Sequence, residues 1–225
     1  MGGDWRGYKK GWHKIPFKKF CDENKILTAP WKIVKTKEDI KKYGFPSVLK
    51  GSSGGSSHEV AILKSEKDID SSFVKNMLSA GYKLLIEKYL PGVEITVAVL
   101  GKRALPVIEI VPPEAGWFDY KNKYWGETKE IPFAPSVSGK FQEDAQQIAE
   151  NIHNTLKLGQ FSRTDFIVSE GKIYVLEVNT IPGLTASSLL PKAALAAGLS
   201  FPKLLDKIIK MIKNPLLKEA LKRYN

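Results

Sequence analysis

Two neighbouring segments with strand periodicity constrain this chain most. Residues 161–168 and 173–179 each alternate between two kinds of side chain, and Ser169-Glu170-Gly171-Lys172 separates them. Period-2 alternation on both sides of a short glycine-containing turn predicts a β-hairpin with one face buried. The face expected to be mostly apolar and to pack on a core carries Thr164, Phe166, Val168, Tyr174, Leu176 and Val178.

The opposite face of this hairpin is polar. A three-residue loop centred on Gly171 would set Asp165 opposite Glu177 and Arg163 opposite Asn179. Two carboxylates and an amide oxygen would then converge beside a guanidinium, and such oxygen ligands suit a hard cation such as magnesium. The alternative is the solvated face of an edge hairpin, which needs no ligand.

The composition is that of a globular chain. With 225 residues and 43% hydrophobic residues it can bury a core in one large or two small domains. The single Cys21 excludes an internal disulfide framework and fits a reducing compartment. No run of eighteen apolar residues and no apolar leader occurs, so we expect a cytoplasmic chain with no membrane partner.

The net charge of +11 comes from 35 basic and 24 acidic residues, and the excess lies in residues 1–50 and 201–225. Lysines that alternate with apolar residues at helical spacing, Lys203, Lys207 and Lys210 beside Leu204 and Ile208, are typical of an amphipathic helix with a solvated face. We therefore do not expect a nucleic-acid partner; part of the positive field would serve a polyphosphate ligand.

The remaining periodicities predict an α+β chain of two units, residues 1–102 and 103–225, the first with antiparallel strands and helices on one side. Further strands are expected at 31–35, 47–50, 59–63, 84–89, 94–100 and 105–111. Helices are expected at 17–24, 37–43, 69–79, 143–158, 187–197, 202–213 and 216–223. An irregular aromatic segment covers 117–125.

A glycine-serine segment, residues 51–57, follows Lys50 between two expected strands. It is either a flexible linker or a flap whose backbone N–H groups wrap phosphates. A strand-end lysine is usually solvated, but together with Lys18 and the pair Glu87 and Glu94 it is also consistent with a nucleotide cleft, for which each residue alone is a weak signal. The backbone after Glu87 could then bind an adenine edge, and Glu94 could accept ribose hydroxyls.

Other polar residues carry weaker signals. The segment 183–188 supplies either ordinary helix N-caps or an anion-binding helix start. We assign no catalytic role to His13, His58 or His153, and we expect His153 on a surface helix. Cys21 is expected to be a small buried residue.

These stretches, in this order, resemble the D-alanine–D-alanine ligases of the ATP-grasp superfamily over about residues 14–213. The resemblance is carried by residues 45–50, 51–57, 85–90, 92–97, 118–124, 163–165 and 176–188. It implies an ATP-grasp fold, in which two α+β subdomains with antiparallel sheets enclose a nucleotide cleft.

The resemblance also implies ATP and Mg²⁺ (or Mn²⁺) as cofactors. It assigns the ATP phosphates to Lys18 and Lys50 under a flap with Ser56 and Ser57, the adenine hinge to Glu87, Lys88, Tyr89 and Leu90, and the ribose to Glu94. The implied metal ligands are Asp165, Glu177 and Asn179.

The acyl-transfer groups follow from the same resemblance. Arg163 and Gly183 match the groups that hold the tetrahedral intermediate, and Ser188 and Leu189 match contacts to the carboxylate of the second amino acid. Lys123 and Tyr124 match a loop that closes the site, with Tyr124 reaching towards Ser56 and Lys123 also near the nucleotide.

The implied activity is ATP-dependent dipeptide formation through an acyl phosphate, with D-alanine as substrate and a role in peptidoglycan synthesis. The chain departs from the family in having no counterpart of its N-terminal domain, and in Gly51 and the pair His58-Glu59 at the two ends of the flap. This leaves open a ligase for another amino acid or peptide, an ATP-binding protein without ligase activity, and a homodimer or partner chain that supplies the missing domain.

Overall fold

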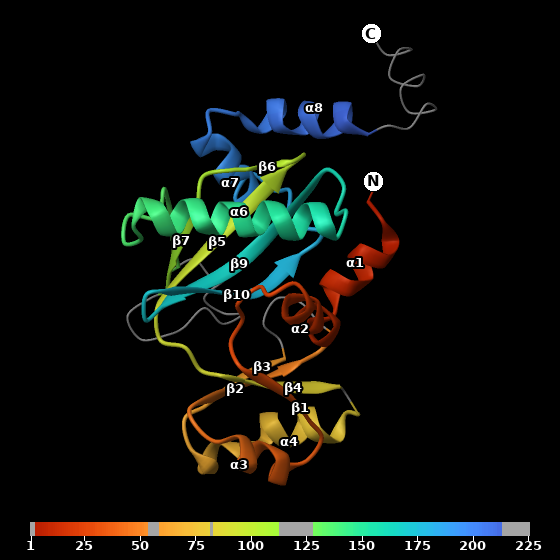
Figure 1. Cartoon of the computed structure of the whole chain (residues 1–225), viewed down its shortest axis with the longest axis vertical. Coiled ribbons are helices and arrows are strands. Elements are labelled where there is room, and N and C mark those ends of the chain that lie inside the picture. The colour runs from red at the N-terminus through yellow and green to blue at the C-terminus, as the bar shows by residue number, and fades with distance from the viewer. Residues whose placement is uncertain (1–2, 54–58, 82, 113–127, 213–225) are drawn as a thin grey trace.

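The computed structural model describes residues 3–53, 59–81, 83–112 and 128–212, which form two antiparallel sheets with helices around them (Figure 1). The helices are α1 (Trp5–Trp12), α2 (Lys14–Glu23), α3 (Lys37–Tyr43), α4 (Ser72–Ser79), α6 (Gly139–Thr155), α7 (Leu189–Ala196) and α8 (Phe201–Met211), with a 3-10 turn at Glu66–Asp70. The strands are β1 (Trp31–Val34), β2 (Ser47–Gly51), β3 (Val60–Leu63), β4 (Leu84–Lys88), β5 (Val93–Leu100), β6 (Arg103–Ala104), β7 (Ile108–Val111), β8 (Lys129–Pro132), β9 (Phe161–Ser169) and β10 (Lys172–Asn179).

The smaller sheet has four strands in the order β1-β4-β2-β3, and α3 and α4 cover one of its faces (Figure 1). Alternation along the strands sorts the side chains. Leu49 and Ile86 enter the core under these helices, whereas their neighbours Lys50 and Glu87 point to the opposite face. That opposite face is directed at the larger sheet, so it is available for a cleft.

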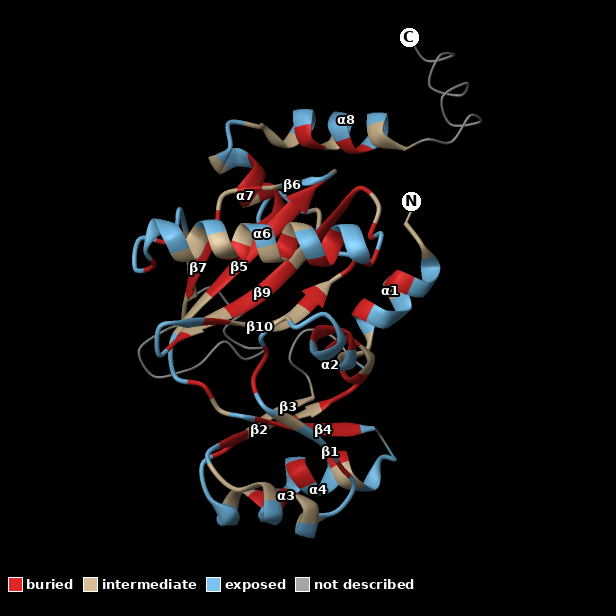
Figure 2. Cartoon of the chain, in the orientation of Figure 1, coloured by how far each residue is buried: buried red, intermediate tan, exposed pale blue. Residues whose placement is uncertain are grey.

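The larger sheet follows the order β10-β9-β5-β7-β8, with β6 paired to β5. Two apolar cores lie on its two faces, and Figure 2 shows β5 and β9 buried where α6 crosses them. One core joins the sheet to α2 and α6 through residues such as Phe166 and Ile152, and the other joins it to α7 and α8 through Phe161 and Leu190. Helices thus pack on both faces of the larger sheet.

The chain passes between the sheets at residues 89–92. We expected the strand at 94–100 to belong to the first unit, but β5 pairs with β9, β7 and β6 in the larger sheet. Gly92 makes this passage close, because a Cβ there would lie 2.1 Å from the Val168 carbonyl oxygen. Sheet membership changes at this point, while the domain boundary at residue 102 stays a prediction.

The predicted pairing of Asp165 with Glu177, and of Arg163 with Asn179, is confirmed. The predicted loop is wrong. Positive φ angles at Glu170 and Gly171, 49° and 69°, make a two-residue turn, and the register shifts between Val175 and Glu177. The extra residue, Leu176, is a β-bulge that restores the pairing expected from a longer loop.

The bulge also changes which side chains face the core. Ile173, Val175 and Val178 are buried there with Phe166, so the prediction that Tyr174 and Leu176 share that face is wrong. The cause is the bulge, because one unpaired residue reverses the alternation of a strand. Leu176 lines a cavity between the sheets instead.

Three further differences concern the elements in and around the larger sheet. Helix α1 was not expected, because Gly7 and Gly11 are poor helix formers; here they let α1 pack closely on Leu156 and β10. Only residues 108–111 of the strand expected at 105–111 form a strand, β7, and the short β6 before it and β8 were missed. The helix expected at 216–223 lies outside the described residues.

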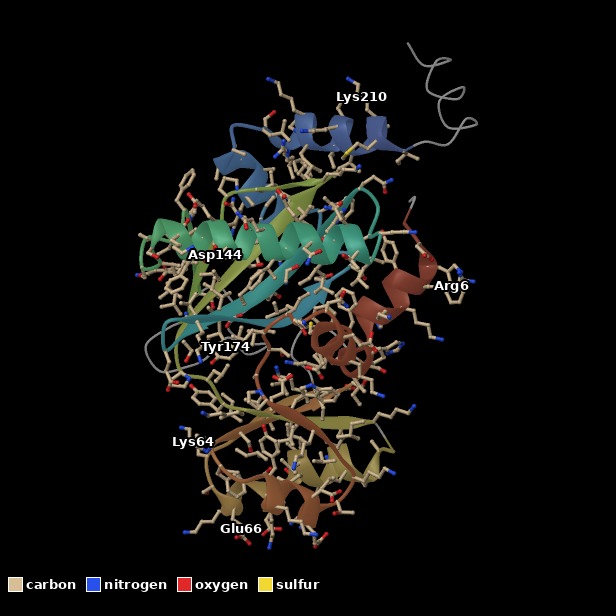
Figure 3. The ribbon with its side chains drawn as sticks, viewed as in Figure 1. Arg6, Lys64, Glu66, Asp144, Tyr174 and Lys210 are labelled. Atoms are coloured by element: carbon tan, nitrogen blue, oxygen red, sulfur yellow. The ribbon has the colours of Figure 1, made fainter. Side chains whose placement is uncertain are left out.

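The lysines of the C-terminal amphipathic segment lie on the surface. Lys203, Lys207 and Lys210 on α8 are exposed while Leu204 and Ile208 are buried, which confirms the amphipathic helix. Figure 3 shows Lys210 and Arg6 pointing outward from α8 and α1. Within the described ranges no helix combines the length and apolarity needed to cross a bilayer.

Candidate active site

A cavity of about 390 Å³ lies between the two sheets. Its walls come from β2, β3 and β4 on one side and from β5, β7, β9 and β10 on the other, and its apolar lining includes Val48, Ile62, Ile110, Ile167 and Leu176. Six residues expected at a nucleotide site line it: Lys50, Glu87, Lys88, Tyr89, Leu90 and Glu94. An apolar slot with a few polar groups at its rim is the usual form of a small-molecule site.

The segment after β4 forms the rim of this cavity. The Lys88 N–H donates to the Pro30 carbonyl at 2.9 Å, and the Tyr89 N–H donates to the Pro46 carbonyl at 3.2 Å. Both bonds hold the segment against the smaller sheet. The next N–H group, that of Leu90, donates to no acceptor within the described residues.

Lys18 and Lys50 meet at Glu87, which is 2% exposed. Glu87 Oε1 lies 3.0 Å from Lys18 Nζ, and Oε2 accepts a hydrogen bond from Lys50 Nζ at 2.7 Å. Lys18 Nζ also donates to Thr28 Oγ1. Burial lowers the pKa of Lys18, although Glu87 opposes the effect, while Lys18 and Lys50 outweigh burial and lower the pKa of Glu87. The structure therefore brings together the two predicted phosphate lysines.

Polar side chains of β9 and β5 lie side by side, because Asp165 is the register partner of Thr96. Asp165 accepts two hydrogen bonds from Arg163, from Nε at 2.8 Å and from Nη2 at 2.9 Å, and one from Thr96 Oγ1 at 2.6 Å. Burial alone would lower the pKa of Arg163, but Asp165, Glu177 and Glu94 together raise it. The guanidinium is thus fixed in a fork geometry and stays charged.

Glu177 and Asn179 occupy the neighbouring edge strand β10. Glu177 Oε2 lies 2.9 Å from Lys14 Nζ, and Asn179 Oδ1 accepts the Ile181 N–H at 3.1 Å. Lys14 was missed by the sequence analysis, although it precedes Lys18 by one helical turn and so shares its face. Burial alone would lower the pKa of Lys14, but the carboxylates around it, Glu177 first, raise it.

The donor set on this hairpin fits a hard cation. Asp165 and Glu177 are register partners, and Asn179 adds an amide oxygen two residues on. Across the described residues no three His, Cys, Asp or Glu side chains meet as a closed metal cluster. A cation here would therefore be held by two carboxylates, one amide and oxygens of its ligand, which is the arrangement that magnesium prefers.

Gly183 and Ser188 lie next to each other before α7. A Cβ on Gly183 would lie 2.6 Å from Ser188 Oγ, and that hydroxyl accepts the Thr185 N–H at 3.3 Å. Leu189 begins α7 with its side chain in the core beneath that helix. Any contact of Leu189 with a ligand would thus come from its backbone.

The start of the glycine-serine segment is tied to α2. The Ser52 carbonyl accepts the Lys14 N–H at 2.8 Å, and Ser52 Oγ accepts the Ile15 N–H at 3.3 Å. These bonds satisfy N–H groups of the first turn of α2, where His13 provides no side-chain cap. Four of the expected site residues, Ser56, Ser57, Lys123 and Tyr124, lie outside the described residues.

Cys21 and His153, to which the sequence gives no part in catalysis, are both buried, although only Cys21 was expected to be. Cys21 is fully buried as expected, and burial raises its pKa to about 12, which makes the thiol unreactive. The prediction that His153 lies on the surface is wrong. It is 2% exposed because α6 turns it towards β9, where Nδ1 lies 2.8 Å from Ser162 Oγ and Nε2 lies 3.2 Å from the Gly159 carbonyl oxygen.

Comparison with known proteins gives a consistent result. The family model described as "D-ala D-ala ligase C-terminus" matches residues 9–210. A D-alanine–D-alanine ligase of Clostridium botulinum is 40% identical over 194 residues, which cover 82% of this chain and 62% of the relative. One from Syntrophobacter fumaroxidans is 43% identical over 175 residues, covering 76% and 56%.

Solved structures agree with these matches. The D-alanine–D-alanine ligase from Bacillus anthracis complexed with ATP is 29% identical with a TM-score of 0.77, over 99% of this chain and 71% of that one. A second structure of that ligase is 31% identical with a TM-score of 0.79, over 99% and 72%. The chain spans about 62% of the length of the Clostridium relative. The expected ATP-grasp fold is thereby confirmed, and the chain belongs to the D-alanine–D-alanine ligase C-terminal family.

Proposed function

We propose that this chain is an ATP-dependent carboxylate–amine ligase that forms a dipeptide of D-alanine. The observation that supports this most is the convergence of three features on one side of the sheets. They are the apolar cavity between the sheets, the two lysines that meet at Glu87 on its wall, and the hairpin pair Asp165 and Glu177, which α2 links to Glu87 through Lys14 and Lys18. A nucleotide needs these three features for its base, its phosphates and its cation.

The cavity suits the base and sugar of ATP. Adenine would lie between the apolar walls with the Leu90 N–H as its donor, and Glu94 would accept the ribose hydroxyls. The phosphates would reach Lys18 and Lys50, whose two positive charges the single carboxylate of Glu87 balances only in part. The negative phosphates would thus take over from the Glu87 carboxylate as partners of the two lysines. Ser56 and Ser57 remain proposed flap residues over the phosphates.

The hairpin suits the cation and the acyl transfer. Asp165, Glu177 and Asn179 would hold Mg²⁺ or Mn²⁺, and a bound ion offsets charge on the phosphates. A guanidinium has five N–H groups and the bonds to Asp165 use two of them, so Arg163 can donate to an oxyanion while it stays fixed. Gly183 would border the same intermediate.

The reaction follows as two substitutions. A carboxylate oxygen of the first substrate attacks the γ-phosphorus of ATP, the bond from that phosphorus to the bridging oxygen breaks, and ADP leaves. The amine of the second substrate attacks the acyl carbon, phosphate leaves, and the nitrogen loses a proton. The second substrate's carboxylate would face the start of α7 at Ser188 and Leu189, and Lys123 and Tyr124 would close the site.

ADP release in the presence of Mg²⁺, ATP and D-alanine tests the proposal. We expect turnover by the wild type and a loss of at least about 100-fold in Asp165→Asn, because even outer-shell changes cost metal sites 10–100-fold. Asp206→Asn, on the exposed face of α8, makes the same chemical change away from the cavity and should leave the rate unchanged. Intact ATP binding without turnover would contradict the ligase assignment.

One observation favours a second candidate function, a ligase for a substrate other than D-alanine. Since the chain spans about 62% of the Clostridium relative, the first substrate could be held elsewhere, or by a second copy or partner chain. A screen of amino acids and peptides for ADP formation separates a D-alanine ligase from one for another substrate. Tight ATP binding without ADP under every substrate would instead identify a nucleotide-binding protein. A role in peptidoglycan synthesis in the cytoplasm belongs to the ligase proposal alone.

A further inference from the structure

Helix α1 turns small residues inward and large ones outward. Gly7 and Gly11 are buried, and a Cβ on Gly7 would lie 1.7 Å from the Leu156 carbonyl oxygen. Trp5 and Trp12, by contrast, are 66% and 48% exposed. They are seven residues apart, close to two turns of an α-helix, so they lie on the same side of α1, at the edge of the molecule (Figure 1). Large apolar side chains normally face the core, so two tryptophans on one exposed side indicate an interaction surface.

The exposed part of α1 is also positively charged. Arg6, Lys9 and Lys10 are exposed, and the helix contains no acidic residue. The guanidinium carbon of Arg6 lies 5.5 Å from the centroid of the Trp5 ring, and Figure 3 shows Arg6 pointing outward. A cation at this distance is attracted by the face of the ring. Helix α1 therefore presents aromatic and cationic groups together.

A groove of about 350 Å³ lies beside this surface, between α1, α2 and the end of α6. Its lining includes the cations Arg6, Lys10 and Lys157 and the carboxylates Asp4 and Glu23. Asp4 is engaged in capping α1, since its side chain accepts the Arg6 N–H at 2.9 Å. Positive charge thus exceeds negative charge in the groove, which suits an anionic group.

Composition and size select what binds this surface. A second copy of the chain would bring two positively charged surfaces together, which is unfavourable. A stable protein interface takes about 800 Å² from each partner and is poor in lysine, whereas α1 is only about 12 Å long and two of its eight residues are lysines. Tryptophan beside lysine and arginine is instead typical of segments that lie at a membrane surface, where the rings enter the headgroup layer and the cations meet anionic lipids.

We propose that α1 docks this protein on an anionic lipid surface. Trp5 and Trp12 would enter the headgroup layer, Lys9 would contact lipid phosphates, and the groove beside Arg6 would hold the phosphate of one headgroup. The match to the family model begins at residue 9, so Trp5 and Arg6 lie outside it.

The inference goes beyond the proposed function and does not depend on it, because the groove shares no lining residue with the cavity between the sheets. The sequence led us to expect no membrane partner, since it has no run of eighteen apolar residues. Contact at the surface of a membrane needs no such run.

The test is co-sedimentation of the full chain with vesicles of phosphatidylcholine, with and without phosphatidylglycerol. We expect the wild type to bind the vesicles that contain phosphatidylglycerol, and to bind them less tightly as the salt concentration rises. Trp5→Ser together with Trp12→Ser should weaken binding at least about tenfold, because burying one large apolar side chain is worth roughly that factor. Lys9→Gln together with Lys10→Gln should weaken it about fivefold for each lysine.

Matched variants separate this surface from the net charge of +11. Lys203→Gln together with Lys207→Gln removes the same charge from the exposed face of α8, and Phe73→Ser removes an exposed aromatic ring from α4. Both variants should bind the vesicles within about twofold of the wild type. Trp5→Ser alone is measured in parallel, so that the result does not depend on the folding of the double variant.

Four outcomes would overturn the proposal. They are equal binding to the two kinds of vesicle (or to neither), equal losses in the lysine variants of α1 and α8, displacement from the vesicles by inorganic phosphate at constant ionic strength, and a dimer in sedimentation equilibrium that the tryptophan variants abolish. The proposed function is measured separately by ADP release, so the failure of one does not imply the failure of the other.

Discussion

Replacing Glu87 with glutamine should destabilise the protein strongly. The change keeps the size of the side chain but removes the one negative charge between Lys18 and Lys50. Lys18 is 1% exposed and has no access to water, whereas Lys50 is 13% exposed and keeps some. The variant therefore leaves one fully buried ammonium and one partly solvated ammonium facing each other.

Removing one partner of a buried ion pair costs about 3–5 kcal/mol, because the other charge stays buried without compensation. Because one lysine is buried and the other is partly solvated, we expect the free energy of unfolding to fall by about 4 kcal/mol. For a chain of this size each kcal/mol lowers Tm by about 2–4 °C, so Tm should fall by about 8–16 °C. A change of this size is a large part of the usual free energy of unfolding.

The same charge makes the wild type sensitive to acid. Burial alone would raise the pKa of Glu87, but Lys18 and Lys50 hold it below its usual range. The stabilisation is therefore complete above about pH 4.3, the pKa of an unfolded glutamate, and is lost as the pH falls through the lower folded value. Glu87→Gln should flatten this part of the stability curve.

Thermal and urea unfolding of both proteins measure the effect. The matched control is Glu66→Gln, which breaks the exposed ion pair with Lys41 and should leave Tm unchanged within error. Tripolyphosphate supplies negative charge without a base, and it should raise Tm more in Glu87→Gln than in the wild type. A loss below about 1 kcal/mol, or equal losses in the two variants, would refute the reasoning.

Two further predictions concern stability away from the cavity. Burial lowers the pKa of His153 despite its bond to the Gly159 carbonyl, so the unfolded chain binds more protons and the free energy of unfolding falls below about pH 6.5. His153→Gln should remove up to about 1.4 kcal/mol per pH unit of this slope in urea titrations, and an unchanged slope would contradict the assignment. Gly7→Ala should cost about 1–3 kcal/mol, because its Cβ would lie 1.7 Å from the Leu156 carbonyl oxygen. Gly139→Ala, whose Cβ would meet nothing within 4 Å, should be neutral or slightly stabilising, and equal effects in the two variants would argue against close packing of α1.

Much of the fold followed from local patterns. The strands of the smaller sheet and the pairing of Asp165 with Glu177 were predicted, because period-2 alternation and turn residues are encoded within a few positions. The two-residue turn was not, since the apolar Leu176 fits an alternating strand as well as a bulge. The predicted pairing was still right, because the turn is one residue shorter than predicted and the bulge at Leu176 adds one residue.

Other features depend on contacts that no local pattern contains. Lys14 was missed because its partner Glu177 lies on the last strand, far along the chain. The sheet to which β5 belongs was misjudged because a turn with proline and glycine predicts a hairpin regardless of what the strands pair with. His153 was placed on the surface because its partner Ser162 becomes a neighbour only after α6 packs on β9.

The bulge in β10 makes the length of that strand part of the site. If Leu176 were paired as a regular strand residue, the register of the turn would set Glu177 opposite Thr164, on the face buried beneath α6. Both proposed metal ligands of β10 would then point into the apolar core. The placement of Glu177 therefore depends on the bulge as well as on the identities of the ligands, and pairing of Leu176 as a regular strand residue would remove the site while leaving every side chain that forms it in the chain.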